Sequence, residues 1–339
     1  MRKSQVTLKD IAKMLGVSVP TVSRALKDYP DISKNTKKAV KELAEKYNYE
    51  PNQFALNLRK NKSNIIGVMV PEIVHHFFST VISGIVEVAD REGYSVMLFQ
   101  TNESYKKEVR EAKVMLNTRV DGLLISLSNE TTHFSHLEEF IEKGVPIVLF
   151  DKVGKGLDVT KVVVDDFTGA YNATKHLIDQ GFKQIAHIRG PKNPLNAIDR
   201  FNGYKKALED HHIPFNDEFV KTCVGVTHEE GFDATLELLK LTNPPDAIFT
   251  ITDVVAIGAM QAIKKSGLKI GFSDWRMAAA VEPPLSSVKQ PGYEMGKESA
   301  RLLFESIRAT EDNRVIDPTT IELKTEVVVR ESSLKNLQN

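Results

Sequence analysis

A set of carboxylates, aromatic rings and one guanidinium in the second part of the chain could bind a ligand that is rich in hydroxyl groups. Carboxylates accept hydrogen bonds from hydroxyls, a guanidinium donates to them, and aromatic faces stack on the apolar surfaces of sugars. Each of these residues follows a short apolar run of sequence. They are His76, Phe77 and Phe78 after IIGVMV, Asp151 after PIVLF, Arg200 after QIAHIRGP, Asp253 after AIFTIT and Asp274 after GF.

Taken singly, each of these residues also has a purely structural interpretation. The alternatives are an N-cap at Asp253 for a helix over Val254–Ser266, a turn at Asp151, the start of a core-facing helix at Phe77 and Phe78, and an ion pair at Arg200.

Acid–base catalysis is another possible use of Asp and His side chains near strand ends. The sequence contains no phosphate-cradling glycine loop, no nucleophile elbow and no His/Glu cluster at metal-ligand spacing. His75 and His76 are adjacent, which suits neither a helical metal pair nor a proton relay. Cys223 is the only cysteine, so we expect a buried, inert thiol and a reducing compartment. The sequence therefore predicts a binding protein that is not an enzyme and needs neither metal nor cofactor.

The elements that must position these side chains are apolar strands that alternate with amphipathic helices. The strand-like runs are IIGVMV, SVMLF, GLLIS, PIVLF, KVVVDD, QIAHI and AIFTI, and two of the helical segments are Phe77–Glu92 and Tyr105–Asn117. This alternation predicts parallel sheets covered on both faces. Two such sheets in tandem form a cleft, and ligands bind beyond the carboxyl ends of the strands. A periplasmic-type solute-binding protein would share this body, but it would have a signal peptide and no basic N-terminal segment.

The first sixty residues predict three short helices. The expected helices are Thr7 to Leu15, with Thr7 as the N-cap, Val19–Leu26 after Ser18, and Lys34–Tyr47 after Ser33. Gly16 ends the first helix, so that two short helices surround a tight glycine turn. This arrangement is a helix-turn-helix, and the third helix can cover the other two.

In a helix-turn-helix, the second helix enters the major groove of DNA with its N-terminal residues foremost. Here this exposes Val19, Pro20 and Arg24, with Ser18 and Thr21 placed for phosphates. A guanidinium can bond guanine bidentately, whereas the two apolar side chains can contact only thymine methyl groups. The alternative is that these are ordinary surface residues of a small helical bundle.

The charge of the chain is divided unevenly, although its 45 Lys/Arg and 45 Asp/Glu residues cancel. Residues 1–62 hold 14 Lys/Arg and 6 Asp/Glu, a net charge of +8, which leaves −8 for the other residues. A basic segment on an acidic body is typical of a module that neutralises nucleic-acid phosphates. The start, MRKSQVTLKD, has no apolar run behind it, so we expect a cytoplasmic protein.

Three segments resemble the lactose/galactose repressor (LacI/GalR) family of bacterial transcription regulators. They are VTLKDIAKMLGVSVPTVSRAL, PDISKNTKKAV and YNYEPNQFALNLRKNKSNIIGVMVP, and the resemblance continues through essentially the whole chain. It implies an α-helical helix-turn-helix headpiece and an α/β, two-lobed, periplasmic-binding-protein-like effector domain with two parallel sheets and flanking helices. It also implies a homodimeric repressor, associated with the bacterial nucleoid, on a pseudo-palindromic double-stranded operator. The resemblance further implies allosteric control by a small-molecule effector, with a sugar or sugar derivative as the expected class.

The resemblance also implies which residues touch DNA. The matching headpiece positions are Thr7, Leu8, Ser18, Val19, Pro20, Thr21, Ser23, Arg24, Asn35, Thr36 and Tyr49. Residues 52–58 are too few for a stable isolated helix, and they resemble the family's hinge helix, which pairs with its dimer mate in the minor groove. The positions there are Asn52, Ala55, Leu58 and Arg59, with Leu58 as the wedge that unstacks a base step. The alternative is that Phe54, Leu56 and Leu58 are covered by the core.

The effector positions that the resemblance implies are His76, Phe77, Phe78, Asp151, Asn196, Arg200, Val226, Thr252, Asp253, Ser273, Asp274 and Gln290. Two depart from the family pattern: Val226 stands where an aromatic ring is usual, and Ser273 stands where an acid is usual. The effector can therefore differ from the best-known sugars and purines.

Compared with the family, the sequence lacks about seven residues between Ile270 and Gly271. This is enough for a whole strand. Either the sheet is unusual or the sequence skips a segment.

The expected organisation is a headpiece over residues 1–50, a hinge and linker over 51–63, and an effector-binding and dimerisation domain over 64–339. Within that domain, the N-terminal lobe comprises residues 64–163 and 291–317, and the C-terminal lobe comprises 164–290 and 318–339. The tail ELKTEVVVRESSLKNLQN has no sustained heptad, so we expect a dimer without a coiled-coil tetramer. The operator, the effector and the choice between induction and co-repression stay open.

Overall fold

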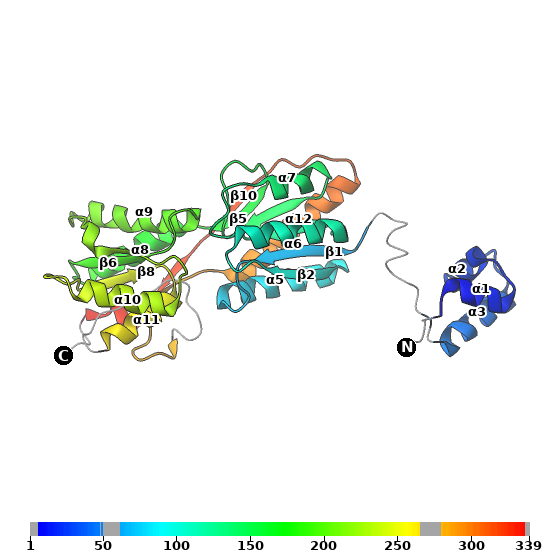
Figure 1. Cartoon of the computed structure of the whole chain (residues 1–339), viewed down its shortest axis with the longest axis horizontal. Coiled ribbons are helices and arrows are strands. Elements are labelled where there is room, and N and C mark those ends of the chain that lie inside the picture. The colour runs from blue at the N-terminus through cyan, green and yellow to red at the C-terminus, as the bar shows by residue number, and fades with distance from the viewer. Residues whose placement is uncertain (1–5, 48, 50–61, 265–278, 336–339) are drawn as a thin grey trace. The chain divides into compact units, whose positions relative to one another are not determined.

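The computed structural model describes residues 6–47, 49, 62–264 and 279–335 of the 339-residue chain. Its contacts divide the chain into two units, Met1–Ser63 and Asn64–Asn339, which we call unit 1 and unit 2. Unit 1 is a small helical body, and unit 2 consists of two lobes in which helices flank sheets (Figure 1).

Unit 1 is a bundle of three helices, each begun by a side-chain cap. The helices are α1 (Leu8–Leu15), α2 (Val19–Leu26) and α3 (Lys34–Lys46), as the sequence predicted to within one residue. Thr7 and Asp10 form a capping box, in which the Thr7 hydroxyl accepts from the Asp10 amide and the Asp10 carboxylate accepts from the Thr7 amide. Gly16 ends α1 in the left-handed region (φ 64°), where glycine has no steric penalty. The fully buried residues between the helices are Ile11, Val22, Ala25 and Val40.

The first lobe of unit 2 contains a six-stranded parallel sheet with the order β10-β5-β4-β3-β1-β2. The strands are β1 (Ile65–Val70), β2 (Ser95–Gln100), β3 (Gly122–Ile125), β4 (Ile147–Phe150), β5 (Thr160–Val164) and β10 (Thr320–Leu323). The helices are α5 (His76–Glu92), α6 (Tyr105–Thr118), α7 (Ser135–Glu142) and α12 (Gly292–Glu311). One face of the sheet packs against α5 and α12, and the other packs against α6 and α7.

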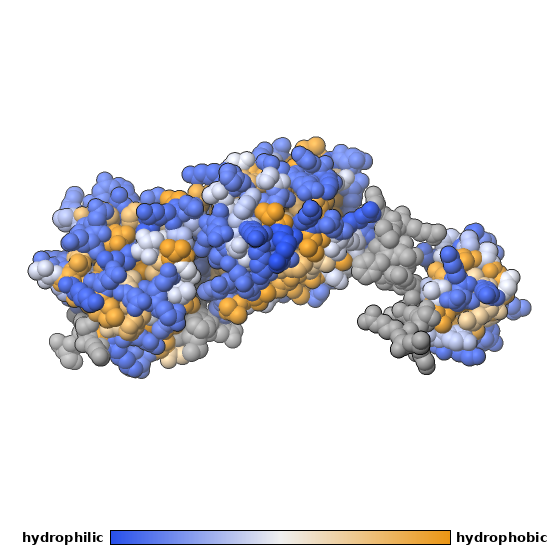
Figure 2. All heavy atoms as spheres, in the orientation of Figure 1, coloured by the Kyte–Doolittle hydropathy of each residue, from blue (hydrophilic) through white to orange (hydrophobic). Residues whose placement is uncertain are grey.

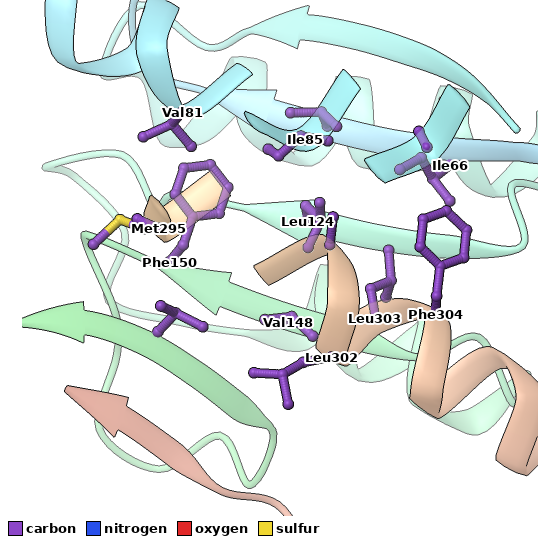
Figure 3. Packing of buried hydrophobic residues seen from close by; sticks show 14 of the residues in the cluster. Ile66, Val81, Ile85, Leu124, Val148, Phe150, Met295, Leu302, Leu303 and Phe304 are labelled. Atoms are coloured by element: carbon purple, nitrogen blue, oxygen red, sulfur yellow. The ribbon is translucent and has the colours of Figure 1, made fainter. Parts of the chain in front are cut away.

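Apolar side chains of the strands, α5 and α12 form the larger core of this lobe. Figure 3 shows Ile85 of α5 and Leu303 of α12 near Leu124 of β3, and Val81 of α5 near Phe150 of β4. All five side chains are fully buried. The two helices meet at backbone contact, because a Cβ atom added at Gly296 would lie 2.0 Å from the Val81 carbonyl oxygen. Only glycine therefore fits at this crossing.

The second lobe contains a three-stranded parallel sheet and a two-stranded antiparallel ribbon. The sheet has the order β7-β6-β8, and β9 pairs with β11. The strands are β6 (Ile185–Arg189), β7 (Val220–Thr222), β8 (Ala247–Thr250), β9 (Ser287–Lys289) and β11 (Glu326–Val328). The helices are α8 (Asp166–Asp179), α9 (Leu195–Asp210), α10 (His228–Leu239) and α11 (Asp253–Ile263), with 3-10 turns η1 (Asp217–Phe219) and η3 (Glu331–Ser333). All seven predicted apolar runs are strands of the two parallel sheets, which confirms the α/β class.

The predicted lobe boundary at residue 318 is wrong. Strand β10 pairs with β5 in the sheet of the first lobe, and its Ile321 and Leu323 pack against the core of that lobe. Burying these two side chains on an otherwise open sheet edge keeps the segment in the first lobe. The chain therefore crosses to the second lobe only after Leu323.

The helix predicted over Val254–Ser266 begins one residue earlier, at Asp253. Its N-cap is Thr252, whose hydroxyl accepts from the Val255 amide, so the interpretation of Asp253 as the N-cap is wrong. Ser266 lies outside the described residues. The junction of Ile270 with Gly271 lies outside them as well, so the two explanations for the missing segment both stand.

Candidate DNA-reading face and ligand cleft

The N-terminal turn of α2 presents an exposed face, as expected of a reading helix. Val19, Pro20 and Arg24 are exposed, while the opposite face of the helix is buried in the bundle. The Ser18 hydroxyl lies 2.8 Å from the Thr21 hydroxyl, at the same end of the helix. This end of α2 therefore offers two hydroxyls, one guanidinium and two apolar side chains.

Arg24 is restrained by two neighbours that the sequence reasoning missed. Its Nη2 atom lies 2.6 Å from Asp31 Oδ2, and its guanidinium carbon lies 5.2 Å from the centre of the Tyr29 ring. Half of the Arg24 side chain stays exposed, so the guanidinium is restrained but accessible. An acidic residue in the loop directly after a reading helix is the signal that could have found this pair.

The other predicted headpiece residues have roles in folding. Thr7 caps α1, Leu8 and Tyr49 pack against the bundle core, and the Thr36 hydroxyl lies 2.8 Å from the capping hydroxyl of Ser33. Burial raises the pKa of Tyr49. Of the remaining headpiece and hinge residues, Ser23 is half-buried and Asn35 is exposed, while Asn52, Ala55, Leu58 and Arg59 lie outside the described residues.

A cleft in unit 2 is lined by residues of both lobes and brings together most of the predicted effector residues. These are His76, Phe77, Phe78, Asp151, Asn196, Arg200, Val226, Thr252, Asp253 and Gln290. The cleft holds about 950 Å³ that protein atoms do not fill, and this space includes open solvent. Its walls include the loops after β1, β4, β6 and β8, as expected for parallel sheets. Ser273 and Asp274 lie outside the described residues.

Asp151 lies on the first-lobe wall, directly after β4 and in the left-handed region (φ 57°). Its Oδ2 accepts from the Ser126 hydroxyl at 3.3 Å, and its Oδ1 accepts from Nδ2 of Asn196, in the second lobe, at 3.4 Å. Burial raises the pKa of the Asp151 carboxyl, against the opposing effect of the Lys152 and Arg200 charges. Asp151 is thus more than a turn residue, because its carboxylate joins the two lobes.

Arg200 is buried in the second lobe and forms the ion pair that its structural interpretation predicts. Its Nε donates to Asp166 Oδ1 at 2.7 Å, and its Nη1 donates to the Ile251 carbonyl at 2.8 Å. Burial raises the pKa of Asp166 to about 7, although the charge and hydrogen bond of Arg200 lower it. The sequence reasoning missed Asp166 as a partner, and the available signal was that a buried guanidinium requires a carboxylate.

The remaining polar and aromatic wall residues are also held by their own lobes. The Asp253 carboxylate is buried and accepts from the Ser287 hydroxyl at 2.6 Å. Phe77 and Phe78 meet edge to face, with ring centres 5.3 Å apart. Phe78 is buried in the first-lobe core, as the structural interpretation predicts, and Phe77 is half-buried beside it.

Val226 reaches the cleft from a loop with an unusual backbone. Its φ is 54°, a left-handed value that is rare for a β-branched residue. The Glu230 carboxylate fixes this loop by accepting from the amides of Val224, Gly225 and Thr227, at 2.9, 3.1 and 3.2 Å. The small side chain of Val226 is therefore held at the wall by the backbone around it.

Both Lys/Arg side chains that line the described walls are paired with carboxylates. Lys152 forms an ion pair with Glu103, and Arg200 forms one with Asp166. An anionic ligand would have to compete with a carboxylate for either cation. The described part of the wall therefore favours an uncharged ligand.

The described residues contain no group of three His, Cys, Asp or Glu side chains that could hold a metal ion. Within the same residues, no helix has the length and apolar character needed to cross a membrane. Figure 2 shows hydrophilic and hydrophobic residues interspersed on the drawn faces of both units.

Cys223 is buried, and burial raises the pKa of its thiol to about 12, as expected of an inert thiol.

Comparisons with known proteins cover both units. The family described as "Bacterial regulatory proteins, lacI family" matches residues 7–52, and that described as "Periplasmic binding proteins and sugar binding domain of LacI family" matches residues 63–325. The chain is 33% identical to the ribose operon repressor of Halalkalibacterium halodurans, over 96% of this chain and 97% of that protein.

Two solved structures are similar over nearly the whole chain. A lac repressor dimer bound to operator and the anti-inducer ONPF has a TM-score of 0.82 and 26% identity, over 98% of this chain and 100% of that one. A complex of the transcriptional regulator CelR with cellobiose has a TM-score of 0.72 and 27% identity, over 96% of this chain and 99% of that one.

Proposed function

Because the chain belongs to the lacI family of bacterial regulatory proteins, we propose that it is a transcription repressor whose affinity for operator DNA is set by a small molecule in the cleft of unit 2. The named relatives are repressors, so the chain is a regulator and not an enzyme. The observation that carries the proposal is the presence, in one chain, of an exposed helix-turn-helix face and a polar cleft between two lobes. The repressor acts as a homodimer in the bacterial cytoplasm, at the nucleoid.

Operator sequence is read by the exposed face of α2. Arg24 bonds a guanine in the major groove, and Val19 and Pro20 contact thymine methyl groups. Ser18 and Thr21 contact phosphates, which fix the position of the helix without reading sequence. The dimer places one such helix on each half of a pseudo-palindrome.

The effector is an uncharged, hydroxyl-rich molecule, a sugar or a sugar derivative. The pairing of Lys152 with Glu103 and of Arg200 with Asp166 supports this class, because a carboxylate already balances the charge of each cation and would repel a phosphate or carboxylate group. The relatives named for ribose and cellobiose support it as well. A sugar that binds both lobes changes operator affinity by its differential affinity for the two arrangements of the lobes.

The regulatory role is tested by gel-shift assays of the full-length protein on DNA upstream of neighbouring sugar-use genes. The assays are repeated with ribose, cellobiose, glucose and glucose 6-phosphate. We expect one uncharged sugar to weaken or strengthen the shift at a specific fragment, and the sign of that change distinguishes induction from co-repression. A protein that shifts every fragment alike, whatever sugar is added, would contradict the proposal.

The reading face is tested by Arg24→Ala, with Lys38→Ala as the matched control. Both variants remove one exposed basic side chain of unit 1, but Lys38 lies on α3 and is paired only loosely with Glu42. We expect Arg24→Ala to lose about 5- to 150-fold in discrimination between operator and random DNA, the contribution of one bidentate base contact. Lys38→Ala should weaken both affinities equally. Discrimination that survives Arg24→Ala would show that α2 reads with other residues.

A further inference from the structure

Three polar side chains of the first lobe form a connected group on the cleft wall that the predicted effector residues do not include. Glu103, Asn129 and Lys152 come from the loops after β2, β3 and β4, and all three line the cleft. Lys152 Nζ contacts Glu103 Oε1 and donates to Asn129 Oδ1 at 2.7 Å. Glu103 Oε2 accepts from the backbone amide of Asn129 at 2.8 Å. We call these residues the polar triad.

The backbone around the polar triad is held in unusual conformations. Asn102 and Glu103 have left-handed φ values of 54° and 58°, and Asp151, next to Lys152, has one of 57°. Non-glycine residues adopt this region at an energetic cost, and they keep it only where surrounding contacts enforce it. Here Leu127 contributes such a contact, since its amide donates to the Lys152 carbonyl at 3.0 Å.

A buried carboxylate fixes the central loop of the triad from behind. Glu108 of α6 has no exposed surface, and its Oε2 accepts from the Ser128 amide at 2.7 Å. Its Oε1 accepts from the Thr131 hydroxyl at 2.9 Å and lies 2.9 Å from His136 Nε2. Asn129 therefore sits in a loop whose two sides are tied to the same carboxylate. The triad is rigid before any ligand binds.

The bonds within the triad leave groups that can bond a ligand. An ammonium has three N–H donors, of which Lys152 uses two within the triad, and the side-chain nitrogen Nδ2 of Asn129 donates to none of the described residues. The Glu103 carboxylate has lone pairs beyond the two that its partners occupy. The Lys152 ammonium, a donor, and the Glu103 carboxylate, an acceptor, thus lie side by side at a fixed separation, and their opposite charges balance each other.

We propose that the polar triad reads a pair of neighbouring hydroxyl groups on the effector. Lys152 donates to the oxygen of one hydroxyl, and Glu103 accepts from the O–H of the next, a pairing that vicinal hydroxyls of a saccharide satisfy and a phosphate does not. This inference rests on the proposed function, since it takes the cleft as the effector site. Phosphate is disfavoured because Glu103 would face it at hydrogen-bond distance from the same cation.

Calorimetric titration of the full-length protein with ribose, cellobiose, glucose and glucose 6-phosphate tests the proposal. The variants are Lys152→Met and Glu103→Gln, and the control is Lys155→Met, which removes an exposed lysine of the same loop that does not line the cleft. We expect each triad variant to bind the preferred uncharged sugar at least about 10-fold more weakly, since hydrogen bonds to charged groups are the strong ones. The control should bind as the wild type does.

A series of monodeoxy analogues of the preferred sugar separates recognition from folding. If Lys152 bonds one hydroxyl, removing that hydroxyl should cost the wild type affinity but cost Lys152→Met almost none. Removing the neighbouring hydroxyl should likewise cost the wild type affinity but cost Glu103→Gln almost none, while the other hydroxyls cost all proteins alike. A destabilised variant would instead lose affinity evenly across the series.

Different results overturn different parts of the inference. Triad variants that bind every analogue within twofold of the wild type would make the triad a structural clamp and leave the proposed function intact. Wild-type protein that prefers glucose 6-phosphate, or binds no uncharged sugar at millimolar concentration, would overturn the ligand class and with it the effector part of the proposed function.

Discussion

Replacing Arg200 with Met removes a buried charge and two hydrogen bonds while it keeps the length of the side chain. The lost bonds are those to Asp166 and to the Ile251 carbonyl. Because Asp166 is only 6% exposed, water cannot replace the guanidinium. Breaking a buried ion pair by removing one partner costs about 3–5 kcal/mol when the other partner stays charged. If the carboxyl can take up a proton, the cost falls to that of the lost bonds, about 2 kcal/mol.

The pH therefore decides which of these two costs applies. Asp166 has a pKa raised from 3.8 to about 7 in the folded chain, so the wild type loses stability as pH rises through that window, by up to about 1.4 kcal/mol per pH unit. Arg200 lowers this pKa, so its removal raises the pKa further and extends the loss of stability to higher pH. The stabilities of wild type and Arg200→Met should differ by about 2 kcal/mol near pH 6 and diverge above pH 7 toward about 3–5 kcal/mol.

The stability difference between wild type and Arg200→Met is measured by urea unfolding of the full-length proteins, near pH 6 and above pH 7, followed by circular dichroism. Arg301→Met is the control, because Arg301 lies in ion pairs of α12 that leave about half of its side chain exposed, and such pairs contribute about 0–1 kcal/mol. The double variant Arg200→Met/Asp166→Asn should lose most of the divergence above pH 7, since the carboxyl that is bonded to Arg200 no longer titrates. A cost for Arg200→Met that is below 1 kcal/mol, or equal at the two pH values, would refute this account of the pair.

Three further outcomes follow from contacts outside this pair. Gly296→Ala should lower the urea midpoint by the equivalent of about 2 kcal/mol or more, because the added Cβ meets the Val81 carbonyl oxygen; an unchanged midpoint would mean that α5 and α12 can move apart. Cys223 should resist iodoacetamide in the native protein at pH 8 and react fully in urea, and fast native labelling would contradict its burial and raised pKa. Glu230→Gln should speed amide exchange at residues 224–227, whereas unchanged protection would show that other contacts hold the loop.

The sequence was sufficient for the elements that have a strong local signal. Apolar runs such as IIGVMV and PIVLF can be buried on both faces only in a covered parallel sheet, and they are β1 and β4. Thr7 and Ser18 precede helices because their hydroxyls satisfy amides that have no partner within the helix. Residues after the strands line the cleft because the carboxyl ends of parallel strands share one edge.

Elements with a weak local signal could not be found in this way. Strands β7, β9 and β11 have three residues each, and β10 has four and alternates exposed with half-buried positions. Their strand conformation comes from pairing with segments far away in the chain, such as β5 for β10. The same limit applies to side-chain partners. Asp166 and Arg200 are 34 positions apart, and only the packing of α8 against α9 brings them together.

The distribution of strain and bonding around the cleft indicates which part of unit 2 a bound ligand would move. The left-handed residues at the walls, Glu103, Asp151 and Val226, are fixed largely by bonds within their own lobe, so the wall loops are rigid. Asp151 is also bonded across the cleft, to Asn196, by a long contact of 3.4 Å. A sugar can displace this weak contact and form hydrogen bonds to both walls. Because the wall loops are rigid, such binding moves them little. Under the proposed function, the sugar's binding energy therefore acts on the arrangement of the two lobes of unit 2.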